Sequence, residues 1–394
     1  MLMALLMACL SSCSDDEERL SAVPYAVLDT IVSTQDITFD AALHDVAEQM
    51  GLGDEDLAPY RQRLNMAAMR SRVYHAHVIT YHSSDPDGKP VIVSGVVYYP
   101  KSGKPRGVIE ALSYNKNKMD YPSANIANLE LLQGMAGYIV IVSDQIGCGV
   151  TDTMVVPYFN HDNTVRVNAD LRRAATELVR NEYGRSMPSW TLISGFSFAA
   201  SEAWALARYY HQHPELGVEV AQVWLSGGAY HPVAVFQEQL RSRHADYAFI
   251  PNAIYSVNHY GHLGLDLHQV FRGELREHYE EWCTGRMALR QLTERLGTDV
   301  GQYLNLDFFR DDNDDYRRLM DCMRRMDIPD DWVPTCNVHL YHARDDSYVP
   351  VGCSDTLAAY LRSVGVDVDY VVTDGGHLEN GIQMASHLAE MLYK

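Results

Sequence analysis

The stretch Gly195-Phe196-Ser197-Phe198-Ala199 follows a hydrophobic strand predicted over residues 190–194 and leads into a helix of small residues, 199–205. A sharp turn from strand to helix can expose a serine, and it requires small neighbours because the chain doubles back on itself. Gly195 and Ala199 meet that requirement. The five residues therefore predict an exposed, nucleophilic Ser197, although an isolated pattern of this kind also fits an ordinary helix start.

Two later strands are each followed by residues that suit such a serine. Residues 338–343 lead into Asp345 and Asp346, and residues 368–372 are followed within a few positions by His377. The carboxyl ends of parallel strands meet at one edge of a sheet, so these side chains can approach Ser197 there. Serine, acid and histidine also follow one another in the order that α/β-hydrolases use.

The chain resembles the α/β-hydrolases, and in detail the secretory-lipase group of serine esterases. Asp346-Ser347-Tyr348-Val349-Pro350 is similar to the acid loop D-x-x-V-P of that group, and Gly376-His377 is similar to its terminal G-H. Asp144-Gln145-Ile146-Gly147-Cys148-Gly149, after the apolar run 138–142, resembles its D-x-x-G-x-G loop. These motifs are spread over about residues 72–394, with no resemblance between residues 230 and 335.

The resemblance implies a catalytic triad and acyl transfer through a covalent serine ester. Ser197 would attack the carbonyl, His377 would take its proton, and Asp346 would hold the imidazole. Asp346 is preferred to Asp345 because it stands at the D-x-x-V-P spacing, and Asp374 is a more distant alternative.

An oxyanion hole is needed as well. The amide of Phe198, the residue after the nucleophile, is expected to supply one donor. The second is expected from Ser113 or Tyr114, which follow the strand predicted over residues 107–112.

The order of the predicted elements gives the fold class. Strands over 107–112, 138–143, 190–194 and 219–225 alternate with helices, which indicates a mostly parallel sheet covered on both faces. A hairpin of strands 72–81 and 90–99 precedes them, and helices are predicted over 39–50 and 54–70. Together with this order, the resemblance implies an α/β-hydrolase fold with a largely helical cap after the sixth predicted strand. The expected divisions are a signal peptide (1–12), a tether with helices (13–70), the first core part (71–226), the cap (227–336) and the second core part (337–394).

The cap is rich in aromatic residues that could line a substrate pocket over the sheet edge. Candidates are Tyr247, Phe249, Tyr255, Tyr260 and Phe271, and for each of them the alternative is a place in the cap's own core. No long, uniformly apolar helix marks a lid for lipid surfaces. We therefore expect small or medium soluble esters as substrates rather than emulsified fat.

The N-terminus resembles a bacterial lipoprotein signal. A short apolar stretch, 1–10, precedes Ser11-Ser12-Cys13, where small residues stand before a cysteine that would be cleaved and lipidated. This predicts a lipid-anchored protein of the cell envelope, whose only membrane contact is through Cys13. The alternative is a buried N-terminal helix with an incidental cysteine.

The oxidising compartment that this implies makes the cysteines informative. Cys283 and Cys322 both lie in the cap, where a disulfide between them is possible. Cys336 and Cys353 flank a strand and stand too far apart to pair. We expect free thiols at Cys148, Cys336 and Cys353.

Composition and charge exclude several other functions. A net charge of −20 disfavours nucleic acids and anionic membrane surfaces as partners. The acidic run 311–315 lacks the glycine and glutamate of a calcium loop, and His259 and His262 lack the partners of a zinc site. Since dinucleotide and phosphate-loop motifs are missing too, we expect neither metal nor cofactor. Three functions remain: a serine esterase on small esters, a non-catalytic ligand-binding lipoprotein with a vestigial site, and a peptidase of the same fold.

Overall fold

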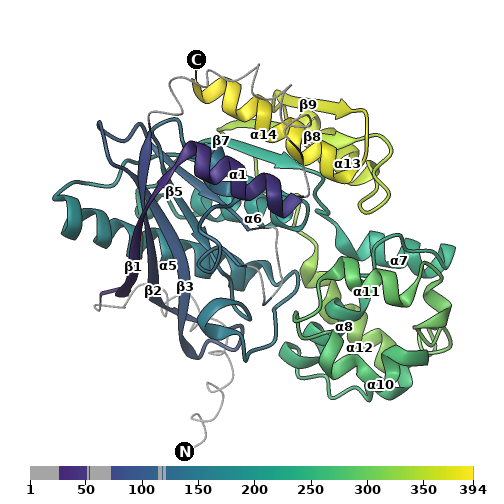
Figure 1. The fold of residues 1–394 in the computed structure, drawn as a ribbon. Coiled ribbons are helices and arrows are strands. Elements are labelled where there is room, and N and C mark those ends of the chain that lie inside the picture. Colours follow the sequence, from purple (N-terminus) through teal and green to yellow (C-terminus); the bar gives the residue numbers. More distant parts are fainter. Residues whose placement is uncertain (1–25, 51–52, 54–71, 114–117, 119–120, 394) are drawn as a thin grey trace, which may run out of the picture.

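The computed structural model describes residues 26–50, 53, 72–113, 118 and 121–393 (Figure 1). Its centre is a nine-stranded sheet with the strand order β1-β2-β3-β5-β4-β6-β7-β8-β9. The strands are β1 (Leu28–Thr38), β2 (Val73–Ser84), β3 (Pro90–Pro100), β4 (Val108–Ala111), β5 (Ile139–Ser143), β6 (Trp190–Phe196), β7 (Glu219–Ser226), β8 (Asn337–Ala343) and β9 (Val368–Thr373).

The sheet is mixed, with a parallel majority. Strands β1, β2, β3 and β5 pair antiparallel in that order, and β5, β4, β6, β7, β8 and β9 then pair in parallel. The predicted α/β class with a mostly parallel sheet is confirmed. The parallel part brings the carboxyl ends of β4, β6, β7, β8 and β9 to one edge, which is where the candidate site lies.

Helices cover both faces of the sheet because the buried strands are apolar on both sides. Ile109 and Val140 pack into one layer, whereas their neighbours Val108 and Ile139 pack into the other. This alternation follows from the two-residue period of a strand. On the first face lie α1 (Phe39–Met50), α4 (Leu129–Gly134) and α14 (His377–Tyr393); on the second lie α5 (His161–Tyr183), α6 (Phe198–Gln212) and α13 (Gly352–Ser363). Among the described helices, none is both long enough and apolar enough to cross a bilayer.

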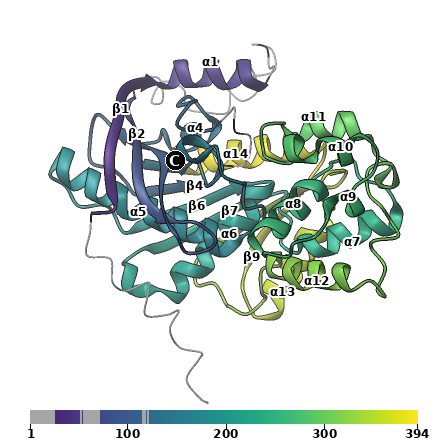
Figure 2. The same ribbon diagram turned by 90° about the horizontal axis from the view of Figure 1, so that it is seen from below.

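The cap forms a helical body beside the sheet (green in Figures 1 and 2). It contains α7 (Pro232–Ser242), α8 (Ile250–Tyr260), α9 (Leu267–Val270), α10 (Gly273–Trp282), α11 (Leu289–Leu296) and α12 (Asp314–Met323). Fully buried side chains such as Phe236, Ile254 and Leu319 give it a hydrophobic core of its own. Tyr158 and Phe159 of the sheet-bearing part pack into that core, so the two bodies share one apolar cluster.

Some predictions differ from the structure. The cap follows β7 rather than a sixth strand, because β1 adds a strand within residues 13–70, where the sequence predicted a tether with helices. The first strand of the hairpin, β2, extends to Ser84, beyond its predicted end at residue 81. The predicted helix 39–50 is present as α1. The predicted signal peptide, Cys13 and the helix over 54–70 lie outside the described residues.

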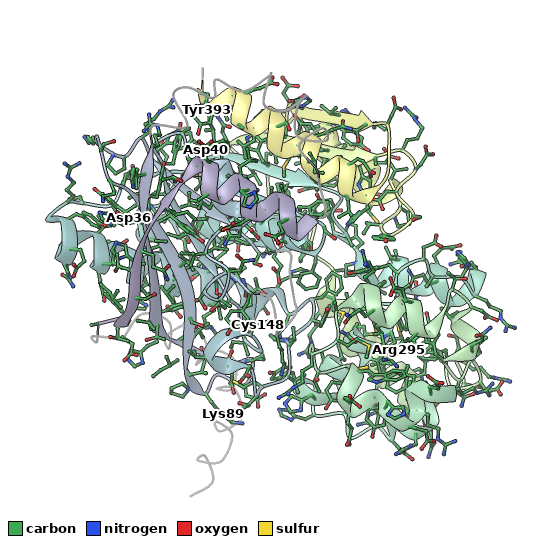
Figure 3. All side chains as sticks on the ribbon, in the orientation of Figure 1. Asp36, Asp40, Lys89, Cys148, Arg295 and Tyr393 are labelled. Carbon is green, nitrogen blue, oxygen red and sulfur yellow. The ribbon has the colours of Figure 1, made fainter. Side chains whose placement is uncertain are left out.

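The cysteines in the described part of the chain are all free thiols. The disulfide considered between Cys283 and Cys322 is therefore absent. Cys283 is buried where α10 ends, and the sulfur of Cys322 lies instead close to Gly261, where α8 ends. Cys148, labelled in Figure 3, is buried in the sheet-bearing part. Free thiols at Cys148, Cys336 and Cys353 agree with the expectation.

Candidate active site

Ser197 occupies the turn between β6 and α6 in a backbone conformation that few residues adopt. Its φ is 59° and its ψ is −127°, and its amide donates to the carbonyl of Ser226 on β7 at 2.7 Å. Gly195 permits the turn, because a Cβ at that position would lie 2.1 Å from the carbonyl oxygen of Ala199. Ala199 itself is fully buried within the α6 core. A strained serine held in this way is typical of a nucleophile elbow.

His377 lies between Ser197 and Asp346. Its Nδ1 is 2.6 Å from Oδ2 of Asp346, and its Nε2 is 2.7 Å from Oγ of Ser197. Because an ionised carboxylate only accepts, Nδ1–H donates to Asp346, and Nε2 is left to accept the proton of Ser197. The structure therefore brings the three predicted residues into one hydrogen-bonded chain, although they come from the ends of β6, β8 and β9.

Asp346 is buried and surrounded by donors. Its Oδ1 accepts from the amides of Tyr348 and Val349, each at 2.9 Å. Burial alone would raise the pKa of this carboxyl, but hydrogen bonds from His342 and His377, the charge of His377 and the Val349 amide together hold the pKa well below its ordinary range. Asp346 therefore stays ionised at any pH at which the protein would work.

The alternative acids do not reach the histidine. Asp345 and Asp374 are both exposed, whereas Asp346 is 7% exposed. Asp345 directly precedes Asp346, yet its side chain turns to solvent as the loop leaves β8. The D-x-x-V-P spacing thus selected the aspartate that faces His377.

The expected oxyanion donors are placed only in part. Phe198 is the first residue of α6 and directly follows Ser197, so its amide lies at the N-terminus of that helix beside the serine. Ser113 is buried just beyond β4, the strand that pairs with β6, but among the described residues it does not belong to the pocket lining. Tyr114 lies outside the described residues.

A cavity of about 250 Å³ opens beside Ser197 and His377. Its walls are mostly aromatic and aliphatic, and they come from both the core and the cap. The lining residues are Tyr158, Phe159, Phe196, Ser197, Phe198, Ala229, Val235, Tyr247, Phe249, Ala288, Leu289, Arg290, Tyr348, Val349, His377 and Leu378. Such a cavity suits the apolar part of a small ligand.

Two of the five predicted pocket aromatics line this cavity. Tyr247 stacks on Tyr348 of the acid loop with ring centroids 4.7 Å apart, and Phe249 contacts Phe159. The other three are accounted for elsewhere: Phe271 is fully buried in the cap core, Tyr255 packs against that core, and the hydroxyl of Tyr260 donates to the carbonyl of Val155.

Asp144 of the D-x-x-G-x-G motif holds loops together near the site. It is fully buried between β3 and a turn of the chain, where it accepts from the hydroxyl of Ser94 and from the amide of Ser123. Burial raises its pKa, while these hydrogen bonds oppose that effect. Its contacts indicate a structural role.

The acidic turn and the histidines also find partners. Asp312, Asp314 and Asp315 form ion pairs with nearby arginines of the same segment. His262 lies 2.9 Å from Asp87, which links the cap to the β2–β3 turn. Each of these four residues therefore has an ion-pair partner within the protein.

Three residues near the site were not found from the sequence. Tyr348 stands with its ring 5.3 Å from that of His377, and His342 contacts Asp346 from β8. Gly227, just beyond β7, approaches His377 closely. The D-x-x-V-P motif contained Tyr348 only as a variable position, and neither of the other two carries a sequence signal that separates it from ordinary core or turn residues.

Replacing Gly227 with alanine is expected to disturb His377. The residue has a φ of +60°, and a new Cβ would lie 3.1 Å from Cε1 of His377. Backbone strain would cost about 1–2 kcal/mol, and displacement of the imidazole would lower the reactivity of Ser197 at least about tenfold. Gly217→Ala is the matched control, because Gly217 has a φ of +66° with nothing within 4 Å. Thermal unfolding and the rate at which a fluorophosphonate labels Ser197 would be measured for both, and equal labelling rates in the two variants would contradict the expectation.

Comparison with known proteins places the fold. The sequence matches no protein-family model and no curated protein. The structure is similar to the rice cell wall degrading esterase LipA from Xanthomonas oryzae (TM-score 0.72, 17% identity, 92% of this chain and 96% of that one). It is also similar to a proposed hydrolase from Legionella pneumophila (0.75, 17%, 92% and 97%) and to Candida antarctica lipase A in its closed state (0.59, 11%, 93% and 86%). The chain therefore has the α/β-hydrolase fold.

Proposed function

We propose that this protein is a serine hydrolase of carboxylic esters. The observation that carries the proposal is the continuous hydrogen-bonded chain from Ser197 through His377 to the buried Asp346. The apolar cavity beside Ser197 supports it, because an ester group could reach the hydroxyl there. The similar solved structures named as an esterase and a lipase favour esters as the substrate class.

The reaction would proceed through an acyl-enzyme. Oγ of Ser197 attacks the carbonyl carbon while its proton passes to Nε2 of His377, and Asp346 stabilises the resulting imidazolium. The amide of Phe198 would donate to the developing oxyanion, with Ser113 or Tyr114 as the second donor. The imidazolium then protonates the leaving alcohol, and water activated by His377 releases the acid.

A fluorophosphonate probe is expected to label the protein at Ser197 and to leave Ser197→Ala unlabelled. Asp346→Asn should lower ester turnover by about 10⁴-fold, because the imidazole would then lose its tautomer and its counter-charge. Asp345→Asn is the matched control and should stay within about twofold of the unaltered protein. The measurements are mass spectrometry of the labelled peptide and hydrolysis of p-nitrophenyl esters.

The result would also separate the competing functions. Absence of labelling in folded protein would favour a ligand-binding protein with a vestigial site. Labelling without hydrolysis of any ester, but with cleavage of peptides, would favour a peptidase. A large effect of Asp345→Asn and a small one of Asp346→Asn would overturn the assignment of the acid.

The cavity size favours small or medium acyl groups. About 250 Å³ exceeds the roughly 150 Å³ that holds one benzene ring, but it is small for a long fatty acid. The cap residues Tyr247 and Phe249 and the core residue Phe159 form walls that would limit chain length.

Among p-nitrophenyl esters, kcat/KM should therefore be high from acetate to hexanoate and fall steeply for palmitate. Leu289→Ala, which removes part of the pocket wall, should raise the relative rate on longer chains by about tenfold, since two or three methylenes gain space. Leu306→Ala is the control: Leu306 packs in the cap without lining the cavity. A profile unchanged by Leu289→Ala would contradict this assignment of the acyl site.

We also propose that the protein is a lipoprotein anchored in the cell envelope through Cys13, on the strength of the sequence signal alone. Expression of the full chain in a bacterial host with labelled palmitate should give a labelled, detergent-extracted protein. Cys13→Ser should abolish the label, whereas Cys9→Ser should retain it. Labelling that persists in Cys13→Ser would rule this anchor out.

A further inference from the structure

A second histidine lies behind the acid of the site. His342, near the end of β8, has no exposed surface. Its Nε2 is 2.8 Å from the carbonyl oxygen of Val349 and 3.4 Å from Oδ2 of Asp346. Its Nδ1 is 2.7 Å from the hydroxyl of Ser354 on α13, which is fully buried as well. The mechanism set out above assigns no role to this group.

These partners determine where the protons lie. A carbonyl oxygen only accepts, so Nε2 of His342 carries a hydrogen and donates to Val349. The same N–H faces Asp346. In the neutral ring Nδ1 then accepts, and the hydroxyl of Ser354 donates to it. The Nε2–H of His342 is thereby directed at the acid loop.

Besides the direct contact, His342 is also linked to Asp346 through the backbone of Val349. Its carbonyl accepts from His342, while its amide donates to Oδ1 of Asp346 at 2.9 Å. His342 therefore restrains the loop that begins at Asp346 through a short hydrogen bond and reaches the carboxylate itself through a longer contact. Both restraints act on the group that orients His377.

We propose that His342 is a positioning residue for the ester hydrolysis proposed above, on which this inference rests: its Nε2–H holds the Asp346 loop so that the carboxylate stays aligned with Nδ1 of His377. It touches neither substrate nor nucleophile. Ser354 has a supporting part, because its hydroxyl selects the tautomer that places the proton on Nε2.

The groups around Asp346 and His377 determine how the pH dependence of the reaction should change in a variant of His342. Burial raises the pKa of the Cys353 thiol to about 12, so this neighbour stays neutral. If the loop shifts, the carboxylate of Asp346 stabilises the imidazolium that forms on His377 less strongly. The acidic limb of the kcat/KM profile should therefore move down. His342 on β8 contacts Asp346, Tyr348 in the acid loop contacts His377, and Cys353 on α13 lies near Asp346. Glu379 on α14 accepts from the amide of Gly376, next to His377.

The test compares His342→Phe, His342→Gln and His339→Gln in the full chain. The phenylalanine variant should lose about tenfold to hundredfold in kcat with KM within about twofold, and its acidic limb should fall by about half a pH unit. The glutamine variant keeps a donor and should recover most of the loss. His339, on the same strand and 2.9 Å from Asp369, controls for replacing a histidine of β8 that pairs with a carboxylate.

Ser354→Ala covers the case in which the phenylalanine variant fails to fold. This variant keeps the ring of His342 but removes the hydroxyl that fixes its tautomer. It should therefore lose less kcat than His342→Phe, and its acidic limb should also move to lower pH. Thermal unfolding of each variant separates folding from catalysis. The rate of fluorophosphonate labelling against pH reports the same limb without ester turnover.

The proposal would be overturned if glutamine were as damaging as phenylalanine, or if kcat fell in proportion to stability with the acidic limb unmoved. Full activity of a folded His342→Phe would overturn it as well. Absence of Ser197 labelling in the unaltered protein would instead reject the proposed function, and this inference with it.

Discussion

The backbone of Ser197 is the constraint on which the rest of the site depends. A serine held at φ 59° and ψ −127° projects from the end of β6 only while the turn before it stays tight and the helix after it stays close. Gly195 satisfies the first condition, and the small residues at the start of α6 satisfy the second. The strain is carried by the packed sheet around β6, since an isolated turn would relax. The distances to His377 follow from this fixed position.

The second constraint is the cost of burying a charge. The carboxylate of Asp346 is buried from water. Four donors take the place of water: two amides of its own loop, the ring of His377 and the N–H of His342. The positions of these donors depend on one another, because His342 also hydrogen-bonds to the loop that supplies the two amides. Removal of one donor would therefore disturb the others, which is the usual behaviour of a buried polar network.

The sequence predicted the fold class and the three linked residues because their signals are local. Ser197, Asp346 and His377 each stand just past an apolar strand, and parallel strand ends share an edge. β1 was missed because its pattern is mostly polar, and its place in the sheet depends on pairing with β2. The roles of Gly227 and His342 depend on contacts between elements far apart in the chain, which no local pattern records.

The residues that line the pocket could not be predicted from local sequence patterns either. Tyr247 and Phe249 line it, whereas Phe271 is buried in the cap core, yet the sequence presented all of them as cap aromatics. What distinguishes them is the packing of the cap against Tyr158 and Phe159 of the core. The hydrogen-bonded chain at Ser197 is built entirely by residues of the sheet-bearing part, whereas the cavity is lined by residues of both the sheet-bearing part and the cap. Changes in the cap would therefore alter which ligand the cavity accepts without moving Ser197, His377 or Asp346.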